Sequence, residues 1–149
     1  MAGTLHIVAT PIGNLDDITA RAIKILVAAD LILCEDTRVA QKMLARFGIQ
    51  KPRESYHQHS ALRKADYILD LLREGKNLAL VSDAGTPGIC DPGNQLVSAA
   101  VEKFGDEIKI IPVPGASAVA AALSVCGFCA DKFVFLGFPP AKNKRKKYF

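Results

Sequence analysis

The chain has 149 residues, of which half are hydrophobic and 23% are charged, so its composition is that of one globular domain and excludes a disordered segment. The net charge of +4 falls to −1 without the five basic residues of 141–149, so the basicity is local. The N-terminus lacks the features of a signal peptide, and the longest weakly polar run, 116–130, is shorter than the ~18 residues of a membrane span. We therefore expect a soluble, cytoplasmic protein without a membrane partner.

Strand-like and helix-like runs alternate along the chain. In order, the sequence predicts strand 4–10, helix 16–29, strand 31–36, helix 37–47, strand 53–59, helix 60–75, strand 77–82, helix 94–104, strand 108–113, helix 115–126 and strand 133–138. Asp16 or Asp17 is the expected cap of the first helix, Asp36 has the position of an N-cap, and Gly48 that of a C′ residue. The alternation predicts an α/β fold with a mainly parallel sheet and helices on both faces.

The loops after the strands are the expected place for a site, because parallel α/β sheets bind ligands outside the carboxyl ends of their strands. Five such loops are rich in Gly, Pro, Asp or small polar residues: 11–17, 35–38, 57–60, 83–93 and 114–117. Gly13, Gly85 and Gly115 would let the backbone approach a ligand closely. The sequence thus predicts a crevice lined largely by backbone.

Motifs that are missing exclude several common activities. The sequence has no G-x-G-x-x-G after its first strand, no phosphate-binding G-x-x-x-x-G-K-[ST] and no G-x-S-x-G, which disfavours a dehydrogenase, a P-loop enzyme and a serine hydrolase. His57 and His59 have H-x-H spacing but no carboxylate at a set distance, so no metal is expected. Cys126 and Cys129 have redox spacing, but they close a helix-like run, so we interpret them as small apolar residues near a helix end.

The same loops resemble the motifs of a known family. The stretches "HIVATPIGNLDDIT", "CEDTR", "YHQH", "VSDAGTPGICDPG" and "PVPGAS" look like successive motifs of the tetrapyrrole methylase superfamily. Within it they resemble the branch that methylates the ribose 2′-oxygen of a cytidine in 16S, or small-subunit, ribosomal RNA. The resemblance implies the N-terminal domain of a class III S-adenosylmethionine-dependent methyltransferase at 1–138. Residues 139–149 would then be a basic linker to a second domain absent from this chain.

The resemblance also implies S-adenosyl-L-methionine as cofactor, the small-subunit ribosomal RNA or 30S subunit as partner, and a homodimer. The cofactor-binding residues that it implies are Pro11, Gly13, Asn14, Ser82, Asp83, Ala84, Gly85, Thr86, Ile89, Ala116 and Ser117. Transfer of a methyl group from a sulfonium to a ribose hydroxyl needs in-line positioning and a base. The candidates for that catalytic role at the strand ends are Glu35, Asp36 and His57, with His59 and Asp83 as further ones.

Three other functions stay open at this point. A methylase of porphyrin or corrin precursors would share the superfamily motifs, whereas a binding domain would hold a nucleotide-like ligand in the crevice without turning it over. A redox module would use the cysteines of "CGFC". The basic tail favours RNA among these partners. With the second domain absent, we expect the isolated chain to bind cofactor weakly and to catalyse poorly.

Overall fold

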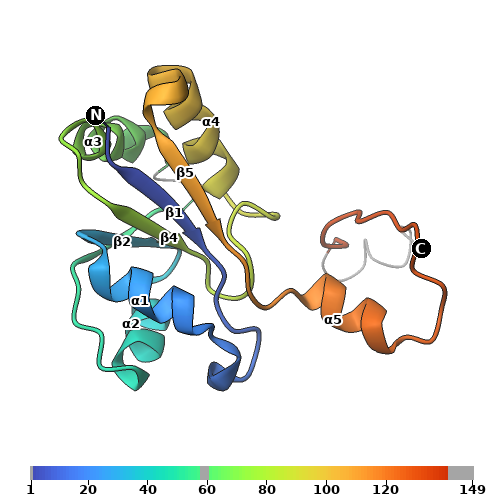
Figure 1. The fold of residues 1–149 in the computed structure, drawn as a ribbon. Helices are drawn as coiled ribbons and strands as arrows, with labels where there is room; N and C mark the ends of the chain where they lie inside the picture. The colour runs from blue at the N-terminus through green and yellow to red at the C-terminus, as the bar shows by residue number, and fades with distance from the viewer. Residues whose placement is uncertain (1, 58–60, 141–149) are drawn as a thin grey trace. The chain divides into compact units, whose positions relative to one another are not determined.

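A computed structural model describes residues 2–57 and 61–140 of the chain (Figure 1). The chain divides into two compact units, the first ending at Ser117 and the second beginning at Ala118. His59 and residues 141–149 of the expected linker lie outside the described residues. The domain boundary at residue 138 stays a prediction.

The first unit is an α/β sandwich around one parallel sheet. Its elements are β1 (Thr4–Val8), the 3₁₀ helix η1 (Leu15–Asp17), α1 (Ala20–Ala28), β2 (Leu31–Cys34), α2 (Thr37–Arg46), β3 (Arg53–Ser55), α3 (Ala61–Arg73), β4 (Leu78–Val81), α4 (Gly93–Phe104), the 3₁₀ helix η2 (Gly105–Glu107) and β5 (Lys109–Val113). The strand order is β3-β2-β4-β1-β5, and every pairing is parallel. The predicted fold class is confirmed.

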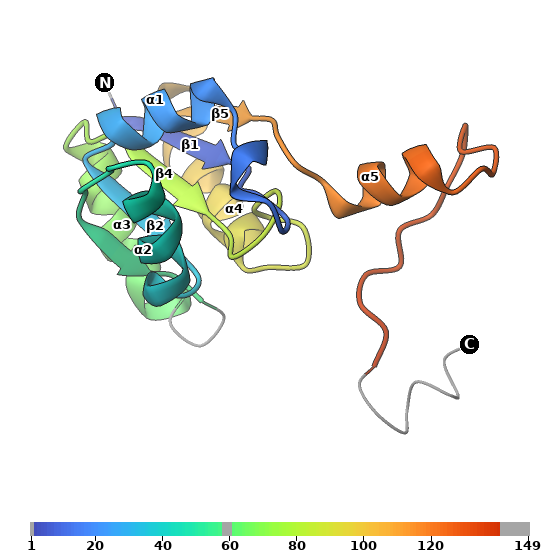
Figure 2. The same ribbon diagram turned by 90° about the horizontal axis from the view of Figure 1, so that it is seen from below.

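Helices cover both faces of the sheet, with α1 and α2 on one side and α3 and α4 on the other (Figures 1 and 2). Side chains of β4 alternate between the two cores, because successive residues of a strand point to opposite faces. Leu78 and Leu80 pack in the core that α3 and α4 cover, and Ala79 and Val81 pack in the core of α1 and α2. All four residues are buried, which explains why this central strand is a continuous apolar run.

The first helix begins later than the sequence predicts, and neither Asp16 nor Asp17 caps it. Both aspartates belong to η1, which Asn14 caps by accepting a hydrogen bond from Asp16 N at 3.1 Å. Ile18 then takes an extended conformation (φ −69°, ψ 136°), so the helix must start anew. Thr19 is the N-cap of α1, because its Oγ1 accepts from Ala22 N at 3.0 Å. The other expected caps, Asp36 and Gly48, are confirmed at the two ends of α2.

Replacing Thr19 with alanine is expected to lower the free energy of unfolding by about 1 kcal/mol. The substitution removes the acceptor of the Ala22 N–H group at the start of α1. Urea denaturation followed by circular dichroism measures the change, and Thr19→Ser, which keeps the hydroxyl, is the control. An alanine variant as stable as the serine variant would contradict the capping role.

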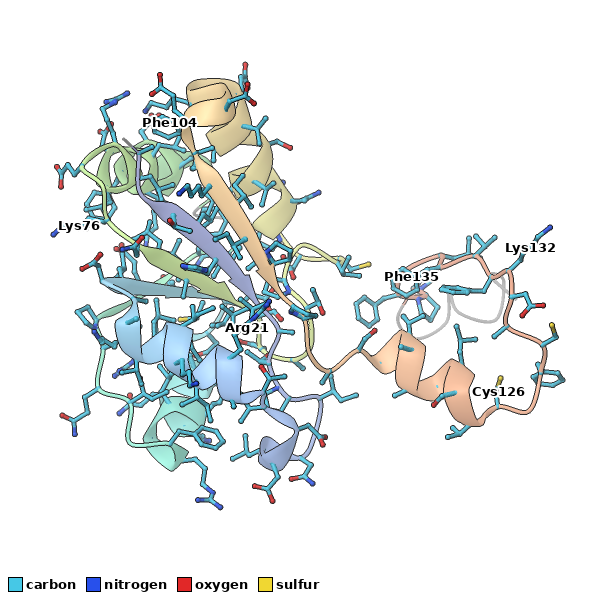
Figure 3. All side chains as sticks on the ribbon, in the orientation of Figure 1. Arg21, Lys76, Phe104, Cys126, Lys132 and Phe135 are labelled. Atoms are coloured by element: carbon cyan, nitrogen blue, oxygen red, sulfur yellow. The ribbon has the colours of Figure 1, made fainter. Side chains whose placement is uncertain are left out.

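The second unit contains α5 (Ala118–Val125) and an irregular segment after it. The strand predicted at 133–138 is wrong: these residues have no regular structure, and the described part of this unit holds no strand that could pair with them. Without a partner strand the ladder hydrogen bonds of a strand cannot form, and the side chains of Val134 and Phe138 are 81% exposed. Cys126 (Figure 3) and Cys129 follow the end of α5, and both are exposed and form no disulfide.

The described residues contain neither a candidate membrane span nor a candidate metal cluster. No helix in ranges 2–57 and 61–140 has both the length and the apolar character that crossing a bilayer requires. The same residues contain no group of three or more histidine, cysteine, aspartate or glutamate side chains that could hold a metal ion.

Candidate functional site

The carboxyl ends of β2 and β4 form a topological switch point of the sheet. These two strands are neighbours, and the chain leaves β2 toward β3 and leaves β4 toward β5, in opposite directions across the sheet. Loops that diverge in this way leave a crevice between them. The loops after β2 and β4 are two of the five that the sequence predicts as the place of a site.

Three loops converge at Gly85, beside this switch point. Thr10 and Gly85 form an antiparallel bridge, in which Thr10 N donates to the Gly85 carbonyl at 2.9 Å and Gly85 N to the Thr10 carbonyl at 3.1 Å. Buried Ser82 donates its hydroxyl to the same Gly85 carbonyl at 3.1 Å. Gly85 has φ +81°, and a Cβ there would lie 3.5 Å from Ile12 Cγ2 and 3.7 Å from the Ala116 carbonyl. The loops after β1, β4 and β5 therefore meet, as the resemblance implies.

The other implied cofactor residues lie on these same loops with different local roles. Asn14 caps η1 through its side-chain oxygen. Pro11 is buried, whereas Gly13, Asp83 and Ala84 are exposed, and Ile89 is 57% exposed. Thr86, Ala116 and Ser117 are half-buried. The exposed members give the three loops a surface that a ligand can reach.

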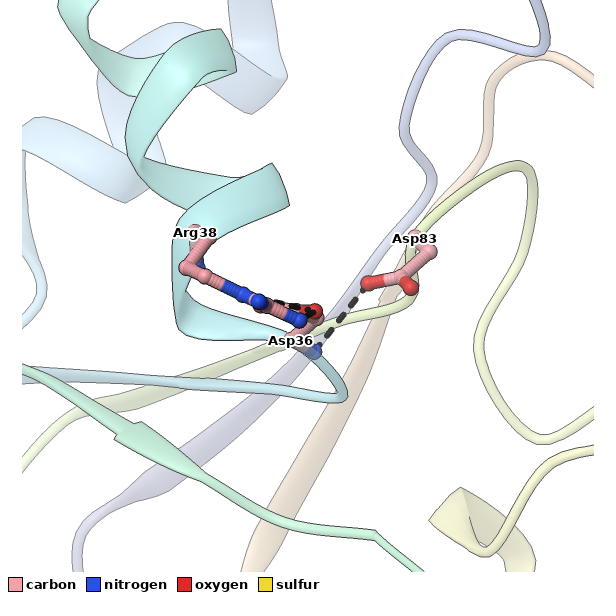
Figure 4. A network of polar contacts seen from close by, with 3 residues as sticks. All are labelled: Asp36, Arg38 and Asp83. Atoms are coloured by element: carbon pink, nitrogen blue, oxygen red, sulfur yellow. Dashed lines mark hydrogen bonds and ion pairs between the residues drawn. The ribbon is translucent and has the colours of Figure 1, made fainter.

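The loops after β2 and β4 are joined by two reciprocal hydrogen bonds. Asp83 N donates to Glu35 Oε2 at 3.2 Å, and Asp36 N donates to Asp83 Oδ1 at 3.1 Å. The Asp36 carboxylate caps α2 by accepting from Arg38 N at 2.8 Å, and it pairs with the Arg38 guanidinium at 2.7 Å (Figure 4). The bonds from Arg38 lower the pKa of Asp36 to about 2. Asp36 therefore holds a proton only in strong acid.

A pocket of about 510 Å³ opens at this edge of the sheet. The residues that line it are Glu35, His57, Cys90, Asp91, Pro92, Asn94 and Gln95. It brings together Glu35 and His57, two of the three candidates for a catalytic role, and Asp36 is not among its lining residues. The loop that holds Cys90, Asp91 and Pro92 is one of the five predicted from the sequence, whereas Asn94 and Gln95, at the start of α4, are not predicted. The loop 83–93 is unusually long, and this length indicates that the residues directly after it, Asn94 and Gln95, could also belong to the site.

The pKa of the Glu35 carboxyl is raised, as expected for a proton acceptor. Burial raises the pKa of its carboxyl, and the negative charges of Asp91 and Asp83 raise it further, while the hydrogen bond from Asp83 N opposes the shift. A carboxyl whose pKa moves toward neutrality accepts a proton more readily when ionised. Such perturbed groups in a pocket are candidates for catalysis.

The chain is similar to proteins of one known family. The model of the family described as Tetrapyrrole (Corrin/Porphyrin) Methylases matches residues 4–147. The chain belongs to this family. It is 50% identical, over 97% of its length, to "Ribosomal RNA small subunit methyltransferase I" of Synechocystis sp., and 49% identical over its whole length to the protein of that name from Neisseria meningitidis serogroup A. The chain spans about half the length of these curated relatives, 51% and 50% respectively.

Solved structures of tetrapyrrole methylases share the fold. Uroporphyrin-III-C-methyltransferase from Thermus thermophilus superimposes with a TM-score of 0.63 at 24% identity, over 87% of this chain and 55% of that one. The cobalt precorrin-4 methyltransferase CbiF gives a TM-score of 0.59 at 26% identity, over 81% of this chain and 49% of its own. The expected resemblance and the expected class III methyltransferase N-terminal fold are thereby confirmed.

In this member of the family, Asp91 holds the rim of the pocket in place. Its carboxylate accepts hydrogen bonds from Gly88 N at 2.8 Å and from Gly93 N at 2.7 Å, which closes the loop between them. Cys90, between these bonds, takes the left-handed conformation with φ 61°, which is rare outside glycine. The closed loop keeps the pocket rim at the start of α4.

Proposed function

We propose that the chain is the N-terminal half of an S-adenosylmethionine-dependent methyltransferase that acts on small-subunit ribosomal RNA, at the ribose 2′-oxygen of a cytidine. The observation that carries the proposal is the identity of 47–50% to proteins named "Ribosomal RNA small subunit methyltransferase I", which extends over nearly the whole chain. The pocket at the switch point supports it, because Glu35 and His57, two candidate proton acceptors, line that pocket.

The converging loops fit the proposed cofactor. A Cβ at Gly85 would lie 3.5 Å from Ile12 Cγ2 and 3.7 Å from the Ala116 carbonyl, so the loops after β1, β4 and β5 lie close enough to contact one ligand. Backbone amides and carbonyls suit a ligand with an amino-acid part and a ribose. S-adenosylmethionine supplies an activated methyl group when bound. The residues that would hold it are Pro11, Gly13, Asn14, Ser82, Asp83, Ala84, Gly85, Thr86, Ile89, Ala116 and Ser117.

Glu35 is the proposed proton acceptor for the ribose hydroxyl. The Asp83 N–H group holds Oε2 at 3.2 Å and so orients the carboxylate, which makes Oε1 the accepting atom in this proposal. His57 lines the same pocket and is the second candidate. We assign Asp36 to capping α2, because its pKa of about 2 makes its carboxylate a weak base. The 510 Å³ pocket would then receive the acceptor nucleotide.

Calorimetry with S-adenosylmethionine tests the cofactor, on this chain and on a protein extended to the full length of the relatives. We expect binding to the extended protein and weaker binding to the chain alone, because the relatives contain a second half. Incubation of the extended protein with 30S subunits and S-adenosylmethionine is expected to transfer one methyl group to a cytidine ribose, read by mass spectrometry of RNA digests. Methylation of porphyrin or corrin precursors alone would contradict the RNA substrate, and binding without turnover would indicate a binding domain.

The proposal also includes a cytoplasmic location, where ribosomal subunits are found, and a homodimer. Light scattering of the extended protein after size-exclusion chromatography measures its mass in solution. A mass of one subunit would contradict the dimer and leave the proposed reaction unaffected.

A further inference from the structure

Helix α2 exposes a row of cations. Arg38, Lys42 and Arg46 follow each other at intervals of four residues, so they share one face of the helix. All three are exposed, and the side chains of Arg38 and Arg46 are 86% and 62% exposed. Ala40, Met43 and Leu44 are buried in the core on the opposite face. The orientation of α2 is therefore fixed by packing, and the cations are held toward solvent.

Nothing within α2 neutralises this row. The ten residues of the helix include no aspartate or glutamate, and like charges four residues apart destabilise a helix. Outside the helix, Asp36 pairs with Arg38 at 2.7 Å, and Asp16 approaches Arg46 at 4.0 Å with both side chains largely exposed. Among the described residues, no carboxylate forms an ion pair with Lys42. The row keeps a net positive charge.

A polar groove of about 470 Å³ lies beside the end of this row. The residues that line it are Gln41, Ala45, Gly48, Ile49, Gln50, Lys51 and Arg53. Two are cations, two are amides, and none of the described lining residues is acidic. Arg53 donates from Nη1 to the Lys51 carbonyl at 3.4 Å, which holds its guanidinium at the groove. Cations and amide donors without carboxylates suit phosphate oxygens.

We propose that the row and the groove, together called the α2 surface, bind the phosphodiester backbone of the RNA substrate. The inference rests on the proposed function for the identity of the polyanion. Thr37, the first residue of α2, follows Asp36, which is bonded to Asp83 at the candidate site. From Arg38 to Arg46 the helix rises about 12 Å. The α2 surface thus begins beside the candidate site and extends along the helix, so one RNA strand could contact both.

RNA fits this surface better than an anionic membrane does. Helices that lie on membranes insert a broad apolar face beside their cations. On α2 the large apolar side chains are buried except that of Val39, which is 40% exposed. The groove adds amides, which hydrogen-bond to phosphate and sugar.

The salt dependence of RNA binding tests the α2 surface. The test variant is Lys42→Gln/Lys51→Gln in the full chain, and its matched control is Lys76→Gln/Lys109→Gln, which removes two exposed lysines elsewhere (Lys76 is labelled in Figure 3). The probe is a labelled single-stranded RNA oligonucleotide from the small-subunit ribosomal RNA, followed by fluorescence anisotropy. Because each phosphate contact contributes about 0.7 to the slope of log K against log[salt], the test variant should flatten that slope by about 1.4. At 0.1 M salt this corresponds to roughly 25-fold weaker binding.

The control variant is expected to keep the wild-type slope, and both variants should keep the wild-type circular dichroism and melting curve. Equal flattening by both variants, or an unchanged slope in the test variant, would overturn the inference. So would tighter binding to phosphatidylserine vesicles than to RNA. The proposed reaction is judged separately, by cofactor calorimetry and by RNA mass spectrometry on the extended protein, so either proposal can fail while the other stands.

Discussion

Replacement of Glu35 by glutamine is expected to lower the rate of methyl transfer by about 10²–10⁴-fold, the usual contribution of a general base. The dissociation constant for S-adenosylmethionine should not change, because glutamine keeps an oxygen that can accept the Asp83 N–H bond, now 3.2 Å long. The measurement is the single-turnover rate on 30S subunits, with the protein extended to the length of the relatives.

The pH profile gives a second readout of Glu35. Its pKa is raised, and only the ionised carboxylate accepts a proton, so wild-type kcat/KM should rise with pH through a value above that of an ordinary glutamate. The glutamine variant should lose this rise. A raised carboxyl pKa also means that ionisation destabilises the folded state as pH increases through it. The variant should therefore be at least as stable as wild type at pH 7, which separates lost catalysis from lost folding.

Glu54→Gln is the matched control for that experiment. Glu54 lies on β3, pairs with Lys64 at 3.0 Å, and is not among the residues that line the pocket. The same chemical change there should preserve the rate. A glutamine variant of Glu35 with the wild-type rate and pH profile would refute its role as the base and direct attention to His57.

Substitution of Gly93 by alanine is expected to destabilise the protein by about 1–3 kcal/mol, the cost of overpacking a filled site. A Cβ at this position would lie 2.8 Å from Asp91 Oδ1, 2.9 Å from Gly88 N and 3.0 Å from Leu80 Cδ2. The added Cβ would therefore clash with the loop that Asp91 closes and with the core residue Leu80. The expected sign is opposite to that of a normal helical position, where alanine stabilises relative to glycine.

Chemical denaturation measures this effect, and Ser98→Ala, at an exposed position of the same helix, is the control and should stay within about 0.5 kcal/mol of wild type. The pocket rim offers an independent readout. Because the Gly88 and Gly93 amides share the Asp91 carboxylate, their hydrogen-exchange protection should fall together in the alanine variant. A variant of unchanged stability and protection would show that the loop can move aside at little cost.

The sequence by itself determined the fold class and predicted the loops that form the candidate site. Local periodicity was sufficient because β4 is buried on both faces and so must be apolar throughout. Asp36 and Gly48 were assigned to the ends of α2 because caps act within a few residues of themselves. The family motifs lie on the same loops, so the resemblance and the residue pattern indicated the same edge of the sheet.

Local sequence patterns gave wrong predictions where several possible helix caps lay close together and where a strand needed a neighbouring strand. Asp16 and Asp17 were plausible caps, but Asn14 and Thr19 divide that segment into a 3₁₀ turn and a helix. The apolar run at 133–138 has the composition of a strand. It forms none among the described residues, because a strand exists only when a neighbour satisfies its backbone.

Only the tertiary structure decided which candidates meet. Glu35 and Asp83 are 48 residues apart in the chain, and they touch because the order of the sheet places β2 beside β4. The same order brings Asp91 close enough to raise the pKa of Glu35, while Arg38 lowers that of its neighbour Asp36. Adjacent carboxylates thus acquire opposite properties, because a pKa depends on the charges and burial around a group in space, which residue type and local spacing do not contain.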